Sequence, residues 1–359
     1  MPNDRTRRFT LPGIHELNKN QDEALALPME GRHLIIGGPG TGKSVVALLR
    51  ARRLAKNNMN FGVLVYNNTL RHSNRHLFGT DQRFFSDTWD RWFRRHLKER
   101  HSLDVPTLAP DYPGGYRPID WKTVEGQVQS LDNVPDQSDK FIVIDEGQDM
   151  PPTFYQTLVK LGFENFYVAA DQNQQIHPDR CSSRQKIEDT LVIESGETLE
   201  LKTNYRNTRP IALLAQHFYP DDPASPKPDL PDLIPAAETP ELWTYGTANT
   251  ATLAAIADKI LQLSDRNISK LIGIITPDNI VRKKFNDALS RANPRLDNDK
   301  PPVRTFVSGQ KKFPDFGQGG IMVINAQSAK AWSLILSSWL ISTNINSNTI
   351  LMRSRHGFM

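Results

Sequence analysis

The chain has 359 residues, more than one hydrophobic core usually serves, so we expect two domains. Hydrophobic residues make up 38% of it and charged residues 23%, which excludes both a disordered and a membrane-embedded chain. The net charge of +4 permits a nucleic-acid partner without requiring one.

Three features of the sequence indicate where in the cell the protein is located: its apolar runs, its first residues and its cysteine count. The longest apolar runs, residues 271–275 and those around 334–341, are much shorter than the roughly 20 residues of a membrane-spanning helix. Residues 1–10 are polar and rich in arginine, unlike a secretory signal. Cys181 is the single cysteine, so it cannot form an internal disulfide, which fits a reducing compartment. We therefore expect a cytoplasmic protein with no membrane contact.

Short, almost wholly apolar runs are the main structural signal along the chain. Such runs are typical of strands buried on both faces of a parallel sheet. They are residues 33–37, 62–66, 141–145, 166–170, 271–276 and 320–325. Helical patterns at residues 42–55, 152–161 and 278–291 fit crossover helices packed on the sheet. We therefore predict an α/β fold.

Changes in composition suggest how the chain is divided. We expect a first domain at residues 1–200 and a partial second domain at residues 201–330. Within the first domain, aromatic and basic residues at about 71–140 give way to Asp, Pro and Gly, which suggests an inserted segment.

A glycine-rich loop follows the first predicted strand and opens a helix. Glycines allow backbone N–H groups to turn inward around an anion, and the helix N-terminus adds positive potential. Lys43 can reach the outer phosphates of a nucleotide, and Ser44 offers a hydroxyl to Mg²⁺. The loop therefore predicts a phosphate site, with an ordinary glycine-rich turn as the alternative. Its residues are Gly37, Gly38, Pro39, Gly40, Thr41, Gly42, Lys43 and Ser44.

Two adjacent carboxylates end the third predicted strand. Asp145 is predicted to hold Mg²⁺ through water, and Glu146 to orient and deprotonate the attacking water in phosphoryl transfer. The alternative is a solvated acidic pair at a strand end. The phosphate loop on the same sheet favours the catalytic interpretation.

Together these motifs resemble the UvrD/Rep-type superfamily 1 DNA helicases. Residues 145–149 are similar to the family's Asp-Glu-Ala-Gln-Asp box, with Gly147 in place of alanine. The resemblance covers roughly residues 14–330. It implies a P-loop NTPase with two RecA-like parallel-sheet domains that uses ATP and Mg²⁺ and acts on single-stranded DNA with 3′-to-5′ polarity.

Further nucleotide contacts come from the same resemblance. Gln21 would read the adenine edge, and Gln174 would sense the γ-phosphate. Tyr205 would stack on adenine, and Arg206 would act as an arginine finger. Each of these residues would be unremarkable alone, and their order along the chain supports the assignment.

DNA contacts are also implied by the resemblance. Residues 84–95 interleave aromatic rings with arginines, which suits base stacking beside phosphate neutralisation. The helical spacing of Trp89, Trp92 and Phe93 favours the alternative that these rings belong to the core. The residues expected at DNA are Asn68, Thr88, Ser328 and Lys330.

Residues 331–359 depart from the resemblance. Relatives continue with Gly-Leu-Glu-Phe-Asp and later Arg-Leu-Tyr-Val, whereas this chain continues with Ala331 and Trp332. Reading possible codons of residues 331–336 two bases later gives Val-Glu-Phe-Asp-Thr, and residues 356–359 can be read as Arg-Leu-Tyr-Val. We therefore predict a frameshifted, aberrant tail that leaves the second domain incomplete with an exposed sheet edge. ATP binding should then be weak at most, and unwinding absent, unless a separate downstream fragment completes the fold.

The alternative to a helicase is an ATP-binding regulatory or defence-associated protein without unwinding activity. ATP turnover with and without single-stranded DNA distinguishes the two. The oligomeric state stays open.

Overall fold

The computed structural model divides into two compact units. The N-terminal unit comprises Leu11–Lys202 and Pro220–Pro228, and the C-terminal unit comprises Met1–Thr10, Thr203–Tyr219 and Asp229–Met359. The residues that the structure describes are 11–66, 68, 70–72, 74, 85–110, 117–174, 181–219, 227–233, 240–244, 250–293, 300–305, 318–326, 339–344 and 349–354.

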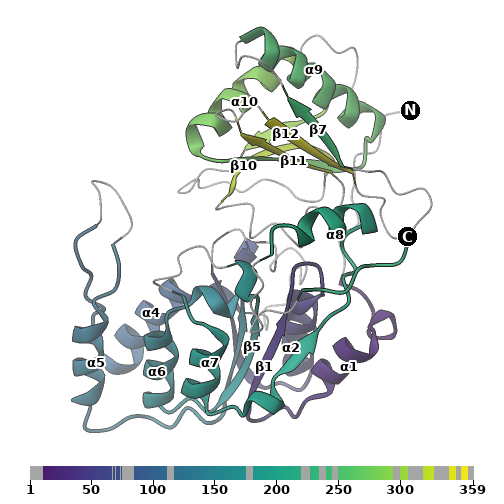
Figure 1. Cartoon of the computed structure of the whole chain (residues 1–359). Helices are drawn as coiled ribbons and strands as arrows, with labels where there is room; N and C mark the ends of the chain where they lie inside the picture. The colour runs from purple at the N-terminus through teal and green to yellow at the C-terminus, as the bar shows by residue number, and fades with distance from the viewer. Residues whose placement is uncertain are drawn as a thin grey trace. The chain divides into compact units, whose positions relative to one another are not determined.

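A six-stranded parallel sheet is the centre of the N-terminal unit (Figure 1). Its order is β3-β2-β4-β5-β1-β6, so β5 lies between β4 and β1. Every neighbouring pair in this sheet is parallel. The strands are β1 (Arg32–Gly37), β2 (Asn60–Val65), β3 (Ser86–Thr88), β4 (Lys140–Asp145), β5 (Asn165–Ala170) and β6 (Leu199–Leu201).

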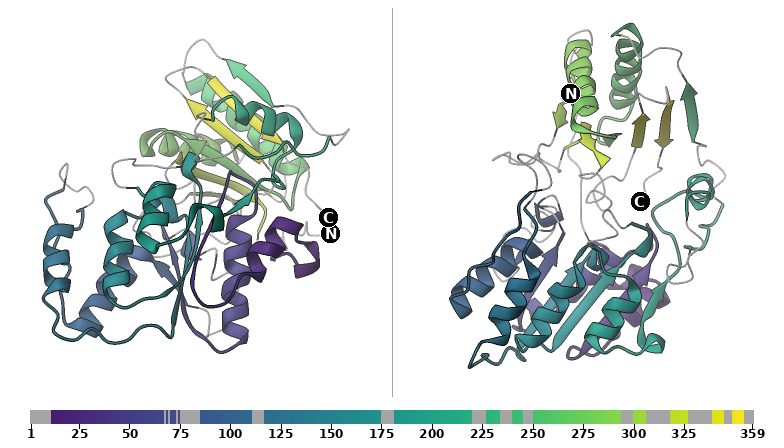
Figure 2. Two further views of the ribbon diagram at one scale, coloured as in Figure 1. Left: turned by 60° about the horizontal axis from the view of Figure 1, so that its bottom comes forward. Right: turned by 60° about the vertical axis from the view of Figure 1, so that its left-hand side comes forward.

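Helices cover both faces of this sheet. The helices of the unit are α1 (Lys19–Ala26), α2 (Lys43–Lys56), α4 (Trp89–His101), α5 (Trp121–Gln129), α6 (Pro152–Lys160) and α7 (Arg184–Leu191). Leu34 and Ile36 of β1 belong to one buried cluster with α4, α5, α6 and α7, whereas α2 packs on the opposite face with α1 beside it (Figures 1 and 2). Helices can pack on both faces because successive side chains of a strand point to opposite faces of the sheet.

The second sheet, in the C-terminal unit, has the order β7-β12-β11-β8-β10-β9. β12 runs antiparallel to both of its neighbours, and the pairs β11–β8, β8–β10 and β10–β9 are parallel. The strands are β7 (Glu241–Thr244), β8 (Leu271–Thr276), β9 (Val303–Thr305), β10 (Gly320–Asn325), β11 (Trp339–Asn344) and β12 (Thr349–Ser354).

Two helices pack on one face of this second sheet. They are α9 (Thr250–Arg266) and α10 (Asn279–Ala292), and α8 (Arg209–Gln216) lies earlier in the chain. Ile272 and Ile274 of β8 and Ile321 and Val323 of β10 form one core with both helices. The side chain of Asp278 caps α10 by accepting from the Val281 N–H.

The α/β fold is confirmed, and all six apolar runs are strands. The predicted strands Leu271–Thr276 and Gly320–Asn325 have the same bounds in the structure. The predicted helix at residues 42–55 is α2, whose N-cap is Gly42. Among the described residues, no helix is both long enough and apolar enough to cross a membrane.

Within residues 71–140, the expected inserted segment, β3 pairs with β2, and α4 joins the buried cluster on the same sheet. The second sheet differs from expectation in two respects. Within residues 331–359, β11 pairs in parallel with β8, and β12 follows it, so tail strands cover this side of β8 where we expected an exposed edge. β12 also makes the second sheet mixed rather than wholly parallel.

Candidate nucleotide-binding site

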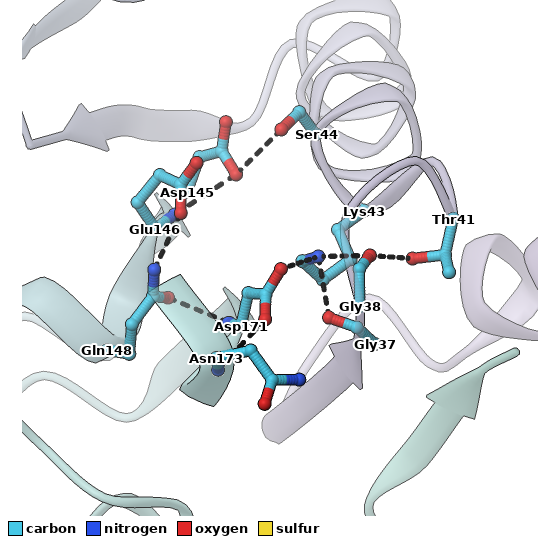
Figure 3. Close-up of polar contacts among 10 residues, drawn as sticks. All are labelled: Gly37, Gly38, Thr41, Lys43, Ser44, Asp145, Glu146, Gln148, Asp171 and Asn173. Carbon is cyan, nitrogen blue, oxygen red and sulfur yellow. Dashed lines mark hydrogen bonds and ion pairs between the residues drawn. The ribbon is translucent and has the colours of Figure 1, made fainter. Parts of the chain in front are cut away.

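Three strands of the first sheet place polar groups at the same edge. β1, β4 and β5 are parallel neighbours in the order β4-β5-β1, so their carboxyl ends lie together. Ligands of open parallel sheets bind outside this edge. The glycine-rich loop follows β1, the acidic pair ends β4, and Asp171 follows β5 (Figure 3).

Glycines shape the loop after β1. Gly40 and Gly42 have φ angles of 86° and 90°, in the left-handed region that favours glycine. A Cβ atom added to Gly37 would lie 2.6 Å from the carbonyl oxygen of Leu201 on β6. The Thr41 hydroxyl donates to the carbonyl oxygen of Gly38 at 2.8 Å and closes the turn. The loop thus brings the first N–H groups of α2 to the sheet edge, as a phosphate site requires.

Lys43 is buried within this loop. Its Nζ donates to the carbonyl oxygens of Gly37 and Gly38 at 2.7 and 2.9 Å and forms an ion pair with Asp171 Oδ2 at 3.1 Å. Burial raises the pKa of the Asp171 carboxyl, while the nearby ammonium opposes that rise. Asp171 was not predicted as a partner of Lys43 from the sequence. A polar residue at the end of a buried strand was the available signal.

Ser44 and Asp145 form the second contact of the site. Asp145 Oδ1 accepts from the Ser44 hydroxyl and from the backbone N–H of Glu146, both at 3.1 Å. Oδ2 of Asp145 is buried and has no hydrogen-bond partner among the described residues. Burial, followed by repulsion from Glu146, raises the pKa of Asp145 to about 7. A buried carboxylate oxygen without a hydrogen-bond partner is a candidate ligand for a cation.

The donor set fits Mg²⁺. This ion needs one or two protein oxygens and takes its remaining ligands from phosphates and water. Asp145 and Ser44 supply such oxygens, and a cation would compensate the unpartnered Oδ2. Among the described residues, no group of three or more His, Cys, Asp or Glu side chains could hold a metal ion.

Glu146 lies beside Asp145 with an unusual backbone conformation. Its φ of 59° is in the left-handed region, which is uncommon for a residue other than glycine. Glu146 Oε2 accepts from Gln148 Nε2 at 2.6 Å, and Gln148 Oε1 accepts from the Asp171 N–H at 2.8 Å. Sequence reasoning treated Gln148 only as part of a motif and missed these contacts.

Gln21 packs against the phosphate loop from α1. Its Nε2 donates to the carbonyl oxygen of Thr41 at 2.9 Å, and its Oε1 accepts from the N–H of Asn18 at 3.2 Å. Asn18 Oδ1 accepts in return from the Gln21 N–H, which completes a capping box. The structure therefore brings Gln21 to the loop, and its contact with adenine stays a prediction.

The remaining expected site residues are distributed over other parts of the chain. Tyr205 and Arg206 lie in the C-terminal unit, where the N–H of Arg206 donates to Asn204 Oδ1 at 3.1 Å. Gln174 belongs to a short 3-10 helix (Gln172–Gln174), but its side chain is outside the described residues. Ser328 and Lys330 are outside them too.

The segment expected at DNA divides into a buried part and a charged part. Trp89, Trp92 and Phe93 of α4 belong to the core, which confirms the core alternative for these rings and excludes them as base-stacking surfaces. Thr88 is half-buried at the start of α4. Asn68 Oδ1 is buried without a hydrogen-bond partner among the described residues.

Three arginines surround one buried carboxylate at the end of β3. Asp87 Oδ1 lies 3.6 Å from Arg71 Nη1 and 3.9 Å from Arg91 Nη1, and Asp87 Oδ2 lies 3.2 Å from Arg95 Nη1. Arg95 also lies over the ring of Phe85, 5.0 Å from its centroid. Three positive charges facing one negative charge leave this arginine cluster with an excess positive charge.

A protein family described as an AAA domain matches residues 21–178. The match includes the phosphate loop, the acidic pair, Gln148 and Asp171. No curated protein sequence matches the chain.

Three solved structures are similar to the chain at low identity. The Pif1 helicase from Candida albicans is 15% identical, with a TM-score of 0.42 over 79% of this chain and 56% of that one. Bacteroides Pif1 bound to ssDNA is 15% identical, with a TM-score of 0.35 over 75% and 55%. The DUF1998 helicase MrfA bound to DNA is 12% identical, with a TM-score of 0.45 over 91% and 44%. The chain thus spans about half the length of these proteins.

Proposed function

We propose that the chain is a superfamily 1 DNA helicase or translocase of the UvrD/Rep type, coupling ATP hydrolysis to binding of single-stranded DNA with 3′-to-5′ polarity. The observation that carries the proposal is the meeting of a phosphate-loop lysine, a metal-type carboxylate and a second carboxylate at one sheet edge. Lys43 opens α2 just after β1, and Asp145 and Glu146 lie at the end of β4, two positions from β1 in the sheet. The sequence resemblance supports the helicase type.

Each residue of the edge has a distinct part in hydrolysis. Bound Mg²⁺ supplies charge neutralisation for the phosphates of ATP. Lys43 exchanges its carbonyl and carboxylate partners for phosphate oxygens, and Ser44 and Asp145 hold the metal. Glu146 accepts the proton of the attacking water.

The remaining nucleotide residues act around this centre. Gln21 reads the adenine edge and Tyr205 stacks on the ring, while Gln174 senses the γ-phosphate. Arg206 stabilises charge in the transition state. These four roles rest on the resemblance of the sequence motifs.

Single-stranded DNA is the proposed polymer partner. The arginine cluster around Asp87 supports this because its excess charge suits phosphodiesters. Thr88 adjoins this cluster in sequence, and Asn68 precedes Arg71 by three residues. Both are therefore proposed to contact the single-stranded DNA. Ser328 and Lys330 complete the proposed contacts.

ATP turnover by the purified chain tests the proposal. We expect hydrolysis that single-stranded DNA stimulates at a fixed, stated salt concentration, and no hydrolysis by Lys43→Ala. Nucleotide binding without DNA-stimulated turnover would instead indicate an ATP-binding regulatory or defence-associated protein. Absence of nucleotide binding would contradict both functions.

We also propose that a one-base shift near the Lys330 codon makes residues 331–359 an aberrant tail and lowers the activity of this chain. Two stretches that regain family-like sequence in one shifted frame support this. Sequencing the gene around that codon decides it: absence of a frame encoding Glu-Phe-Asp and later Arg-Leu-Tyr would contradict the shift. A cytoplasmic location is proposed because the chain has a single cysteine, Cys181, which cannot form an internal disulfide.

A further inference from the structure

Gln148 lies fully buried between two groups of the candidate site. It belongs to a 3-10 helix, Gly147–Asp149, that directly follows Glu146. On one side its Nε2 donates to Glu146 Oε2 at 2.6 Å, and on the other its Oε1 accepts from the Asp171 N–H at 2.8 Å (Figure 3). One primary amide therefore joins the end of β4 to the end of β5.

The chemistry of the two neighbours determines how this amide is oriented. An ionised carboxylate only accepts hydrogen bonds, and a backbone N–H only donates them. An amide satisfies both at once in a single orientation, with its nitrogen toward Glu146 and its oxygen toward Asp171. A glutamate at this position would place a carboxylate against a carboxylate, and an apolar residue would leave a buried N–H unpaired.

Among the described residues, Gln148 is the hydrogen-bond donor seen at the Glu146 carboxylate. No hydrogen bond to its Oε1 is seen among the described residues, and its side chain has three rotatable bonds. The contact from Gln148 therefore restrains the carboxylate while leaving one oxygen free to accept a proton. The next residue in the chain of contacts, Asp171, holds Lys43 Nζ at 3.1 Å. The carboxylate and the phosphate-loop lysine are thus joined through Gln148 and Asp171.

We propose that Gln148 is a positioning residue that fixes the Glu146 carboxylate and ties it to Asp171. Its place between the two strand ends keeps the carboxylate at a constant position relative to the phosphate loop. The catalytic part of this inference rests on the proposed function, because it takes Glu146 as the base in ATP hydrolysis. The structural part concerns contacts within the chain and can be tested separately.

Turnover tests the catalytic part. Gln148→Met keeps the length of the side chain and removes both hydrogen bonds. We expect kcat for ATP to fall roughly 10- to 100-fold, as when a partner that orients a reactive ligand is removed. KM and the Kd for nucleotide should stay within about twofold, because Gln148 contacts neither Lys43 nor Ser44 in the described structure. Gln185→Met, on the exposed side of α7, is the matched control and should leave both values unchanged.

Exchanging the side chains of residues 146 and 148 tests the structural part, and this test needs no measurement of ATP turnover. Gln148→Glu should accelerate amide hydrogen exchange of β4 and β5 by roughly tenfold at pH 7.5, because two carboxylates then face each other. Glu146→Gln alone should change these rates little. The double variant Glu146→Gln/Gln148→Glu restores an amide facing a carboxylate, so its exchange should return to near the unmodified rate, while its turnover stays lost.

The outcomes separate this inference from the proposed function. Equal exchange rates in Gln148→Glu and in the unmodified chain, or no recovery in the double variant, would overturn the contact. Unchanged kcat in Gln148→Met would overturn the positioning role. A chain that binds no nucleotide would contradict the proposed function, and the exchange measurements would still decide the contact.

Discussion

Lys43 Nζ lies 3.1 Å from Asp171 Oδ2, and both side chains are buried. The same ammonium also donates to two carbonyl oxygens of the phosphate loop. Lys43 therefore has three oxygen partners among the described residues, and phosphate oxygens must compete with them. Among the three, only Asp171 carries a formal charge that would also repel a phosphate.

Replacing Asp171 with Asn should therefore tighten nucleotide binding. The amide keeps the shape and removes the negative charge that competes for Lys43. We expect the Kd for ATP, measured by calorimetry, to fall roughly three- to tenfold. Asp189→Asn on α7 is a control outside the site. Weaker binding by Asp171→Asn would show that Asp171 supports the nucleotide site rather than competing with it.

Glu146→Gln should separate binding from hydrolysis. The amide keeps the shape of the side chain but cannot accept the proton of the attacking water. We expect turnover to fall roughly 100-fold or more, with binding of ATP and Mg²⁺ retained. Single-turnover hydrolysis and equilibrium binding measure the two effects. If hydrolysis persists, another group must act as the base.

Arg206→Ala tests the proposed arginine finger. A residue that acts on transition-state charge affects kcat far more than affinity, so we expect kcat to fall roughly 1,000-fold with less than about a threefold change in the Kd for ATP. Equal losses of both would make Arg206 a binding residue. Arg209→Ala, at the start of α8, serves as the comparison.

Asp145 should make stability depend on pH. Its pKa, raised to about 7 by burial and then by Glu146, exceeds the unfolded value of about 3.9. The folded chain therefore binds the proton more tightly, and the unfolding free energy contributed by this group falls as pH rises from about 4 to about 7. In the nucleotide-free chain, Asp145→Asn should remove this part of the pH dependence.

Urea unfolding at pH 5, 6, 7 and 8, followed by hydrogen exchange of β4, measures the effect. Asp139→Asn, an exposed carboxylate just before that strand, is the matched control. The same pH dependence in Asp145→Asn and in the unmodified chain would contradict the assignment.

Arg91→Ala tests the arginine cluster. Arg91 is half exposed and is the most distant of the three arginines from Asp87, so Arg71 and Arg95 still neutralise that carboxylate. We expect weaker binding of single-stranded DNA and a decrease of about 1 in the slope of log K against log salt. Arg52→Ala, on an exposed position of α2, should change neither value. An unchanged slope would place the DNA elsewhere.

Local sequence patterns determined much of this fold. The apolar runs predicted the strands because side chains buried on both faces of a sheet must all be apolar. The glycine-rich loop was recognisable since its backbone conformation and its lysine are local properties of the chain. Helical spacing likewise indicated that Trp89 and Trp92 belong to the core. Short strands such as β3 and β6 carry too few residues to show a clear period.

Only the tertiary structure decided which strand ends meet. Lys43 and Asp171 are 128 residues apart, and their contact depends on β5 lying beside β1. Gln148 bridges Glu146 and Asp171 because β5 also lies beside β4. Strand order is set by how the helices and strands pack together, a long-range property that no local pattern encodes. The sequence therefore pointed to Lys43, Ser44, Asp145 and Glu146, and sheet topology determined which groups lie beside them.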